Sequence, residues 1–214
     1  MIELWGRKNA YNVQKVLWTL GELNIDYVHH DVGSEPGDLD TAEFIKLNPH
    51  ARIPVLVDDH RAIWESNTIV RYLSATCGEN TLWPASPLQR SYAERWMDWE
   101  LATLQPDFLA LFWGFYRTPE TKRDVERIRH SQARCLQHLN KLDKHLVNQE
   151  YLAGAAFTMG DIACGTCLYR YFEMGLKVDT PAYVLDWYKR LSQREAFQNT
   201  IMVPFDELKG RRTY

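Results

Sequence analysis

The sequence predicts an α/β domain over residues 1–80, a linker over 81–87 and an all-α domain over 88–214. In the first of these stretches, apolar residues alternate between the two-residue period of strands and the 3.6-residue period of helices. A short proline-containing stretch follows, which is typical of a connection between domains. Beyond it only the helical period recurs, so we expect helices alone in the second domain.

The first domain has the element order β-α-β-α-β-β-α, which is typical of a thioredoxin-like architecture. Its first helix is predicted by four apolar residues spaced i, i+3, i+4 and i+7 from Val13. Asn48-Pro49 should end a short second helix, and Ser66 should open the third. Strands are expected over residues 2–6, 27–32, 55–57 and 62–64, and the short helix over 42–47.

The second domain is predicted to contain two long helices. Residues 88–116 carry an aromatic-rich helical pattern, in which Pro106 should kink or break the helix. Apolar residues repeat at helical spacing over residues 120–147, which indicates the second long helix.

Thr158 and Asp161 have the spacing of a capping box, in which each side chain bonds the backbone of the other residue. Phe157 and Ile162 flank this pair at the spacing of a hydrophobic staple. We therefore interpret Asp161 as a folding residue rather than a catalytic one.

Composition excludes several classes of function. The net charge of −3 gives no basic surface for nucleic acid or an anionic membrane. The N-terminus lacks the apolar segment of a signal peptide, and no stretch approaches about 18 uncharged apolar residues. Four cysteines are too few and too irregular for a disulfide scaffold, and the histidines lack metal-ligand spacing. We expect a cytoplasmic protein without metal, nucleic-acid or membrane partners.

Gly6-Arg-Lys-Asn-Ala-Tyr-Asn12 is the first of three segments that could carry chemistry. It connects the first strand to the first helix, so it offers unpaired backbone N–H groups and the positive end of a helix dipole. Such a turn favours an anion, and a thiolate is an anion.

The second segment is Arg52-Ile53-Pro54-Val55, at the entrance to the third strand. A cis bond before Pro54 is one way to form a tight corner there, and it would leave the N–H and C=O of Ile53 free to pair with an extended peptide. An ordinary trans bond is the alternative, and the general frequency of cis prolines favours it.

The third segment, Trp64-Glu65-Ser66-Asn67, ends a strand and begins a helix. Ser66 could simply cap that helix. The same helix start could also bind a carboxylate while Glu65 pairs with an ammonium group. A γ-glutamyl end carries both groups on one carbon, so this residue pair suits it.

Through these segments the chain resembles the cytosolic glutathione transferase superfamily, along essentially its whole length. The matching features are Gly6-Arg7, Asn12-Val-Gln-Lys-Val16, Asn48-Pro49, Arg52-Ile-Pro54, Glu65-Ser-Asn-Thr-Ile-Val-Arg-Tyr72, the linker and the helical half. The resemblance implies glutathione as co-substrate, a thioredoxin-like N-terminal domain, an all-α C-terminal domain and a homodimer.

The resemblance also implies roles for individual residues, carried over by position. Pro54 should be cis, and Ile53 should pair its backbone with the cysteinyl part of glutathione. Glu65 and Ser66 should hold the γ-glutamyl end. Arg52 is similar in place to residues that contact the cysteinyl-glycyl end.

The residue that activates the thiol is where the sequence departs from familiar members of the family. Residues 1–8 contain no tyrosine, and Ala10 occupies the position where other classes have a serine. The chain is similar to bacterial-type members with an asparagine at the helix start, which points to Asn12, with Asn9 as second choice. A plain helix N-cap is the structural alternative for Asn12, and Tyr11 is a weaker candidate.

The predicted reaction is attack of the glutathione thiolate on a small, apolar electrophile, as in detoxification. The electrophile should meet the first helix of the C-terminal domain, whose aromatic residues could line an apolar pocket. We expect Trp113 and Tyr116 to line it. The sequence does not identify the electrophile.

Three alternatives remain open. A glutathione-dependent disulfide or peroxide reductase would start from the same thiolate and needs no protein cysteine. Ala10 lacks a hydroxyl, which keeps open a non-catalytic glutathione-binding scaffold. A thiol–disulfide oxidoreductase would use Cys164 and Cys167, but these lie within a predicted helix, where we expect small buried side chains.

Overall fold

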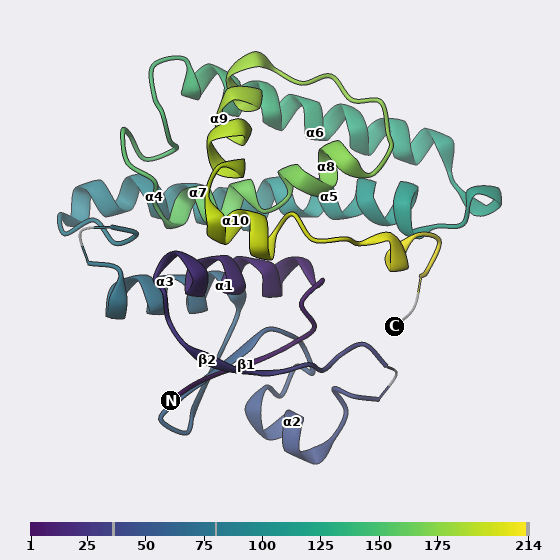
Figure 1. Ribbon diagram of the computed structural model, residues 1–214. Helices are drawn as coiled ribbons and strands as arrows, with labels where there is room; N and C mark the ends of the chain where they lie inside the picture. The colour runs from purple at the N-terminus through teal and green to yellow at the C-terminus, as the bar shows by residue number, and fades with distance from the viewer. Residues whose placement is uncertain (36, 80, 213–214) are drawn as a thin grey trace.

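The computed structural model describes residues 1–35, 37–79 and 81–212. Residues 36 and 80 of the predicted first domain and residues 213–214 of the predicted second lie outside the described residues. Within the described part, a small α/β domain lies below a larger helical domain (Figure 1). The N-terminal elements are β1 (Ile2–Trp5), α1 (Tyr11–Glu22), β2 (Tyr27–His30), α2 (Ala42–Leu47), β3 (Val55–Asp58), β4 (Arg61–Trp64) and α3 (Ser66–Cys77).

The sheet has the strand order β2-β1-β3-β4, with β2 parallel to β1 and the other neighbours antiparallel. Helices α1 and α3 cover one face, where Leu4 and Leu56 of the sheet join their apolar residues in one core cluster. Helix α2 covers the other face, where Phe44 packs with Val55 and Val57 (Figure 1). This arrangement agrees with the predicted thioredoxin-like architecture.

The C-terminal domain is helical throughout its regular elements, as predicted. None of the described helices is long and apolar enough to cross a membrane. Its elements are α4 (Pro87–Trp99), η1 (Glu100–Leu104), α5 (Gln105–Leu111), η2 (Phe112–Arg117), η3 (Glu120–Lys122), α6 (Val125–Leu146), α7 (Met159–Gly165), α8 (Leu168–Glu173), α9 (Ala182–Ser192), α10 (Glu195–Thr200) and η4 (Asp206–Leu208).

The expected break at Pro106 is not found, because the chain stays helical from Pro87 to Arg117. The chain instead forms a π-helix in η1, directly before α5, and a π-helix has a wider turn than an α-helix. In a regular α-helix the ring of Pro106 would meet the carbonyl group of Ala102, and Ala102 lies within this widened turn.

The predicted helix over residues 120–147 is shorter than expected. Only a 3₁₀ turn, η3, forms at its start, and α6 begins at Val125. Asp124 caps α6 by accepting a hydrogen bond from the N–H of Arg127 at 3.0 Å, so the helix can start there without its predicted first turn.

The predicted capping box of α7 is confirmed, with reciprocal bonds between Thr158 and Asp161. Asp161 is fully buried and also accepts hydrogen bonds from the N–H of Leu152 at 2.9 Å and the indole of Trp187 at 3.1 Å. Burial raises the pKa of this carboxyl group to about 6, against the opposing effect of these donors. Asp161 therefore joins α7 to α9 in the core of the helical domain.

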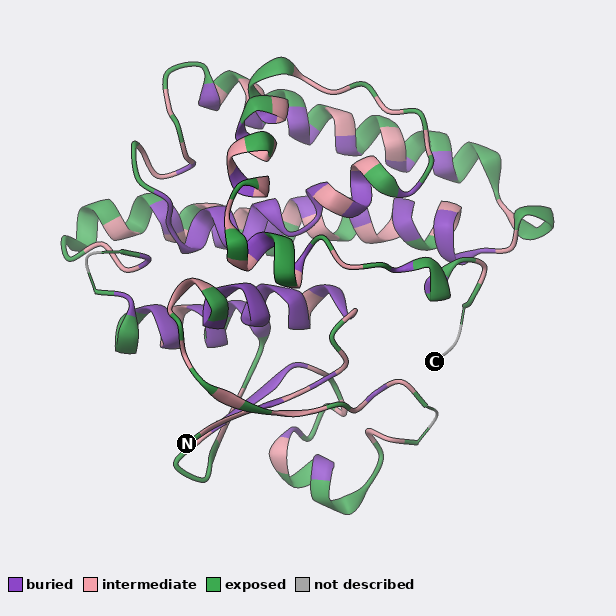
Figure 2. Ribbon diagram, in the orientation of Figure 1, coloured by how far each residue is buried: buried purple, intermediate pink, exposed green. Residues whose placement is uncertain are grey.

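The two domains meet around a buried ion pair. Helix α1 is mostly buried between the sheet and the helical domain (Figure 2). Lys15 of α1 reaches Glu100 of η1 at 2.8 Å, with both side chains 0% exposed, and it donates to Gln105 at 2.9 Å. The Tyr11 hydroxyl also donates to Glu100, at 2.8 Å. Asn67 of α3 approaches the same carboxylate at 3.5 Å.

We predict that Lys15→Met destabilises the protein by about 3–5 kcal/mol, because the Glu100 carboxylate would remain buried without its cation. Urea unfolding measures this change. Lys189→Met is the matched control, since Lys189 forms an ion pair with Asp186 in which the side chains are 62% and 57% exposed. The control should change stability by no more than about 0.5 kcal/mol. Equal effects of the two substitutions would contradict the prediction.

Candidate functional site

The register of the sheet brings the three predicted segments to one end of the N-terminal domain. Trp5, the last residue of β1, lies opposite Val55, the first residue of β3. Val55 in turn lies opposite Trp64, the last residue of β4. The β1–α1 turn, the Ile53-Pro54 bond and the start of α3 therefore all lie at this edge, so a single extended ligand can contact all three.

Gly6 allows the chain to turn sharply between β1 and α1. Its φ is +145°, and a Cβ built on it would lie 2.6 Å from Val13 Cγ2 and 3.1 Å from Ile53 Cβ. Its N–H donates to the carbonyl of His30 at 2.9 Å, and its own carbonyl accepts from His29 Nε2 at 2.7 Å. A side chain at this position would separate α1 from the Ile53-Pro54 bond.

Helix α1 begins without a side-chain cap. Its N-cap is Ala10, so the alternative that Asn12 serves as the N-cap is wrong. Asn12 is the second helical residue, and its Oδ1 atom is buried without a hydrogen-bond partner among the described residues. The side chain is only partly buried, and its Nδ2 donor also lacks a hydrogen-bond partner among the described residues. The helix start therefore keeps unpaired donors next to this amide.

Asn9 and Tyr11 are both engaged elsewhere. Asn9 donates through Nδ2 to the Glu207 carboxylate, and its carbonyl accepts from Arg170. The Tyr11 hydroxyl is directed at Glu100, and burial together with that carboxylate raises the pKa of Tyr11 well above its usual value. Tyr11 therefore remains a neutral donor to Glu100 and cannot give the same hydrogen bond to a ligand.

The Ile53-Pro54 bond is cis, as the resemblance implied. Among the described residues, neither the N–H nor the C=O of Ile53 has a hydrogen-bond partner. Asn48 shapes the loop before it, donating to the carbonyl of Arg52 at 2.8 Å and accepting from the N–H of His50 at 3.0 Å. Sequence reasoning used Asn48 only to end a helix. An Asn-Pro pair just before a predicted corner could have indicated this second role.

The start of α3 differs from the interpretation of Ser66 as a helix cap. Glu65 is the N-cap, at φ +69°, and Ser66 is the first helical residue and is buried. No side chain caps this helix, so its first N–H groups remain available to an anion beside Ser66. Glu65 is adjacent and exposed, so its carboxylate is accessible to a ligand. Arg52 is also exposed.

The two aromatic residues predicted to line a common pocket lie in different surroundings. Tyr116 is buried, stacked on Phe112 at 5.2 Å between ring centroids and packed against Phe205 at 4.9 Å. Trp113 is 37% exposed and lines a 240 Å³ pocket formed with the start of α6. The guanidinium of Arg117 lies 3.8 Å from the centre of the Trp113 ring. Sequence reasoning missed Phe205, which comes from the chain after α10.

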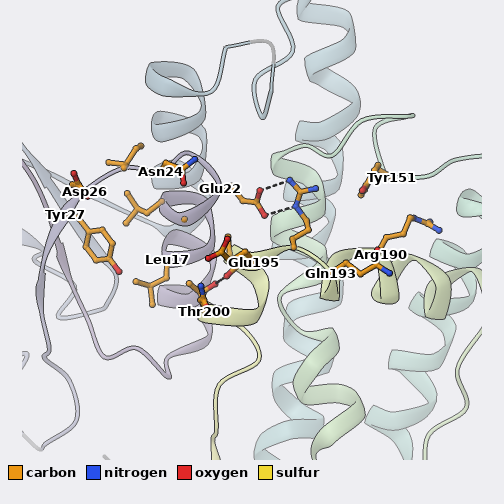
Figure 3. Close-up of a pocket in the computed structure, with 16 residues that line it drawn as sticks. Leu17, Glu22, Asn24, Asp26, Tyr27, Tyr151, Arg190, Gln193, Glu195 and Thr200 are labelled. Atoms are coloured by element: carbon orange, nitrogen blue, oxygen red, sulfur yellow. Dashed lines mark hydrogen bonds and ion pairs between the residues drawn. The ribbon is translucent and has the colours of Figure 1, made fainter.

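A groove of 730 Å³ lies at the opposite end of α1, where Glu22 and Arg194 form an ion pair at 2.6 Å (Figure 3). Asp26 and Glu195 also line this groove. The C-terminal end of α1 presents the negative end of the helix dipole, so the groove is a poor place for a thiolate. The candidate site therefore lies at the N-terminal end of α1.

The cysteines do not form a redox site. Cys164 and Cys167 are buried in α7 and just after it, and burial raises the pKa of both thiols. This agrees with the interpretation of both as small core residues. Among residues 1–35, 37–79 and 81–212, no group of three or more His, Cys, Asp or Glu side chains could hold a metal ion.

Comparison with known proteins identifies the family. Residues 12–76 match the family model of the glutathione S-transferase N-terminal domain, and residues 125–190 match that of the C-terminal domain. Glutathione S-transferase GstB of Escherichia coli (strain K12) is 39% identical over 206 residues, covering 95% of this chain and 99% of that protein. The chain belongs to the glutathione S-transferase family.

Membership of the glutathione S-transferase family confirms the predicted fold class and enzyme class. A theta class glutathione S-transferase from Xanthomonas axonopodis pv. citri, with glutathione bound, is 40% identical, with a TM-score of 0.91 over 95% of this chain and 98% of that one. The glutathione transferase BmGSTD1 of Bombyx mori is 21% identical, with a TM-score of 0.86 over 97% and 95% of the two chains, and shows the shared fold alone.

We predict that Gly6→Ala destabilises this glutathione transferase by about 3 kcal/mol, because the new methyl group would overlap Val13 at an unfavourable φ. Gly175→Ala is the control, since Gly175 also has a positive φ but nothing within 4 Å of an added Cβ. It should cost only about 1 kcal/mol. Urea unfolding compares the two, and an equal cost would show that the close packing around Gly6 has no effect.

Proposed function

We propose that this glutathione transferase binds glutathione along the edge formed by the β1–α1 turn, Ile53-Pro54 and the start of α3, and ionises its thiol beside Asn12. The observation that carries the proposal is the convergence of two uncapped helix starts and a free backbone pair at one edge of the sheet. Helix starts favour anions, and glutathione supplies a thiolate and a γ-glutamyl carboxylate.

The peptide is held by backbone and side-chain groups in turn. The N–H and C=O of Ile53 pair with the cysteinyl residue, as in the addition of one more strand to a sheet. The N–H groups at Ser66 donate hydrogen bonds to the γ-glutamyl carboxylate, and Glu65 pairs with the adjacent ammonium. Arg52 is exposed nearby and is placed to contact the cysteinyl-glycyl end.

The free energy needed to ionise the thiol is within reach of these groups. An unperturbed thiol has a pKa of about 8.5, and lowering it by about 2 units requires roughly 2.7 kcal/mol of preferential stabilisation of the anion. A helix start supplies about 0.3–2 kcal/mol, and one hydrogen bond to a charged group about 1.5–3 kcal/mol. The unpaired Asn12 amide and the backbone together are sufficient without a serine hydroxyl at Ala10.

The electrophile approaches the sulfur from the side of the helical domain. We place it against the aromatic face that contains Tyr116, since apolar walls with few polar groups are typical of such pockets. Trp113 remains a candidate at the outer edge of the same domain. The reaction needs only ionisation and proximity, so no metal takes part. We further propose a cytoplasmic homodimer that acts in detoxification.

We predict that Asn12→Ala lowers turnover at neutral pH about 10-fold or more, with a smaller change in the KM for glutathione, because the amide acts on the thiolate. The pKa of the bound thiol should rise by about 1 unit, which its ultraviolet absorbance reports on titration. Asn140→Ala, at an exposed position on α6, is the control and should change neither quantity.

Other outcomes would redirect the proposal. Unchanged turnover in Asn12→Ala, together with a loss in Asn9→Ala, would move the activating role to Asn9 in spite of its bond to Glu207. Tight binding of glutathione without turnover of an aryl halide would favour the scaffold. Reduction of a disulfide or peroxide faster than conjugation would favour the reductase, which also needs only the bound thiolate.

A further inference from the structure

Arg170 links the helical domain to the β1–α1 turn. It lies on α8, is 3% exposed and donates through Nη2 to the main-chain carbonyl of Asn9 at 2.5 Å. The same nitrogen donates to Gln14 Oε1 at 2.8 Å. Gln14 is also buried and donates in turn to the carbonyl of Thr200 at 2.9 Å. A single guanidinium therefore holds both the turn before α1 and the first turn of the helix.

Aromatic rings enclose the same guanidinium. Its central carbon lies 5.3 Å from the centre of the Phe112 ring and 5.7 Å from that of Phe205. Phe205 belongs to the segment after α10, which passes above the start of α1 (Figure 1). Surroundings of this kind exclude water, so the charge is screened less than one at the surface.

We propose that Arg170 is a positioning residue for the thiol, acting through the carbonyl of Asn9 and the side chain of Gln14 and adding positive potential at the start of α1. The proposal rests on the proposed function, since it concerns the same thiolate. A cation behind the helix start adds to the positive end of the dipole, and both favour the ionised sulfur. Arg170 belongs to the C-terminal domain, so that domain contributes to activation without touching glutathione.

Other charged and titratable groups also face this region and act on the same potential. Glu207 accepts a hydrogen bond from Asn9, and Asp206 acts on the pKa of Tyr116 in the direction opposite to Arg170. Among the described residues, the further groups on these elements include Arg7 and Lys8 on the turn, Tyr11, Lys15 and Glu100 at the domain interface, and Tyr169, Tyr171 and Glu173 on α8. None of these lies between the guanidinium and the Asn9 carbonyl, which are in direct contact.

The experiment titrates glutathione bound to the full-length protein and to four variants. Arg170→Met removes charge and hydrogen bonds, Arg170→Gln keeps a donor for the carbonyl, and Arg170→Lys keeps the charge. Arg190→Met is the matched control, since Arg190 also donates to a main-chain carbonyl, that of Glu150, but lies on α9. Circular dichroism establishes that each variant is folded, and Arg170→Gln replaces Arg170→Met if the latter does not fold.

We expect the pKa of the bound thiol to rise by about 1 unit in Arg170→Met and Arg170→Gln. If the parental pKa is about 6.5, turnover at pH 7 should then fall about threefold and recover by about pH 9, because the thiolate fraction is restored. Arg170→Lys should keep the pKa within about 0.3 units of the parental value. Arg190→Met should match the parental protein in both measurements.

Two results would overturn this proposal alone. One is a thiol pKa within about 0.2 units of the parental value in both uncharged variants. The other is a loss of turnover that alkaline pH does not restore, which would indicate a purely structural role. A parental protein that does not retain glutathione, or that holds it with an unshifted thiol pKa, would overturn the proposed function as well.

Discussion

The buried contact between Lys15 and Glu100 is the interaction on which the arrangement of the site depends. The carboxylate comes from the helical domain, and it accepts hydrogen bonds from Tyr11 and Lys15 of α1. Asn67, from the first turn of α3, lies at the edge of the same contact. One side chain thus fixes the starts of both helices at the candidate site. Because an uncompensated charge in this place would be costly, the two domains cannot slide relative to each other without losing the pair.

Helix α1 separates two different environments along its length. At its start, Ala10 gives no side-chain cap, and the Asn12 amide has an unpaired acceptor. At its end, Glu22 is paired with Arg194 and also accepts a hydrogen bond from the Trp18 indole at 2.8 Å. The polar groups at the far end are therefore satisfied within the protein, while those at the start are left for a ligand.

The fold and the three segments of the candidate site could be predicted from the sequence because each depends on local signals. Periodicity gives the strands and helices, and the capping box of α7 needs only Thr158 and Asp161. The cap of α3 was assigned one residue late, since a non-glycine residue at positive φ such as Glu65 leaves no local signal.

Features that depend on distant contacts could not be predicted. The engagement of Asn9 requires Glu207 and Arg170, which are far away in the chain. The separation of Trp113 from Tyr116 has a similar origin. Residues three positions apart on a helix share a face only approximately. Trp113 therefore lies beside the start of α6, whereas Tyr116 packs against Phe205 from the segment after α10.

The division of the Lys15–Glu100 pair between domains has a consequence for how such proteins can recombine. If this α/β half were joined to a helical half without an acidic residue at the corresponding place, an ammonium group would be left in a dry interior. If this helical half were joined to an α/β half without a basic residue in place of Lys15, the Glu100 carboxylate would be buried without a cation. Chimaeras made by crossing over in the linker should therefore fold only when the incoming half supplies the matching charge at the corresponding place.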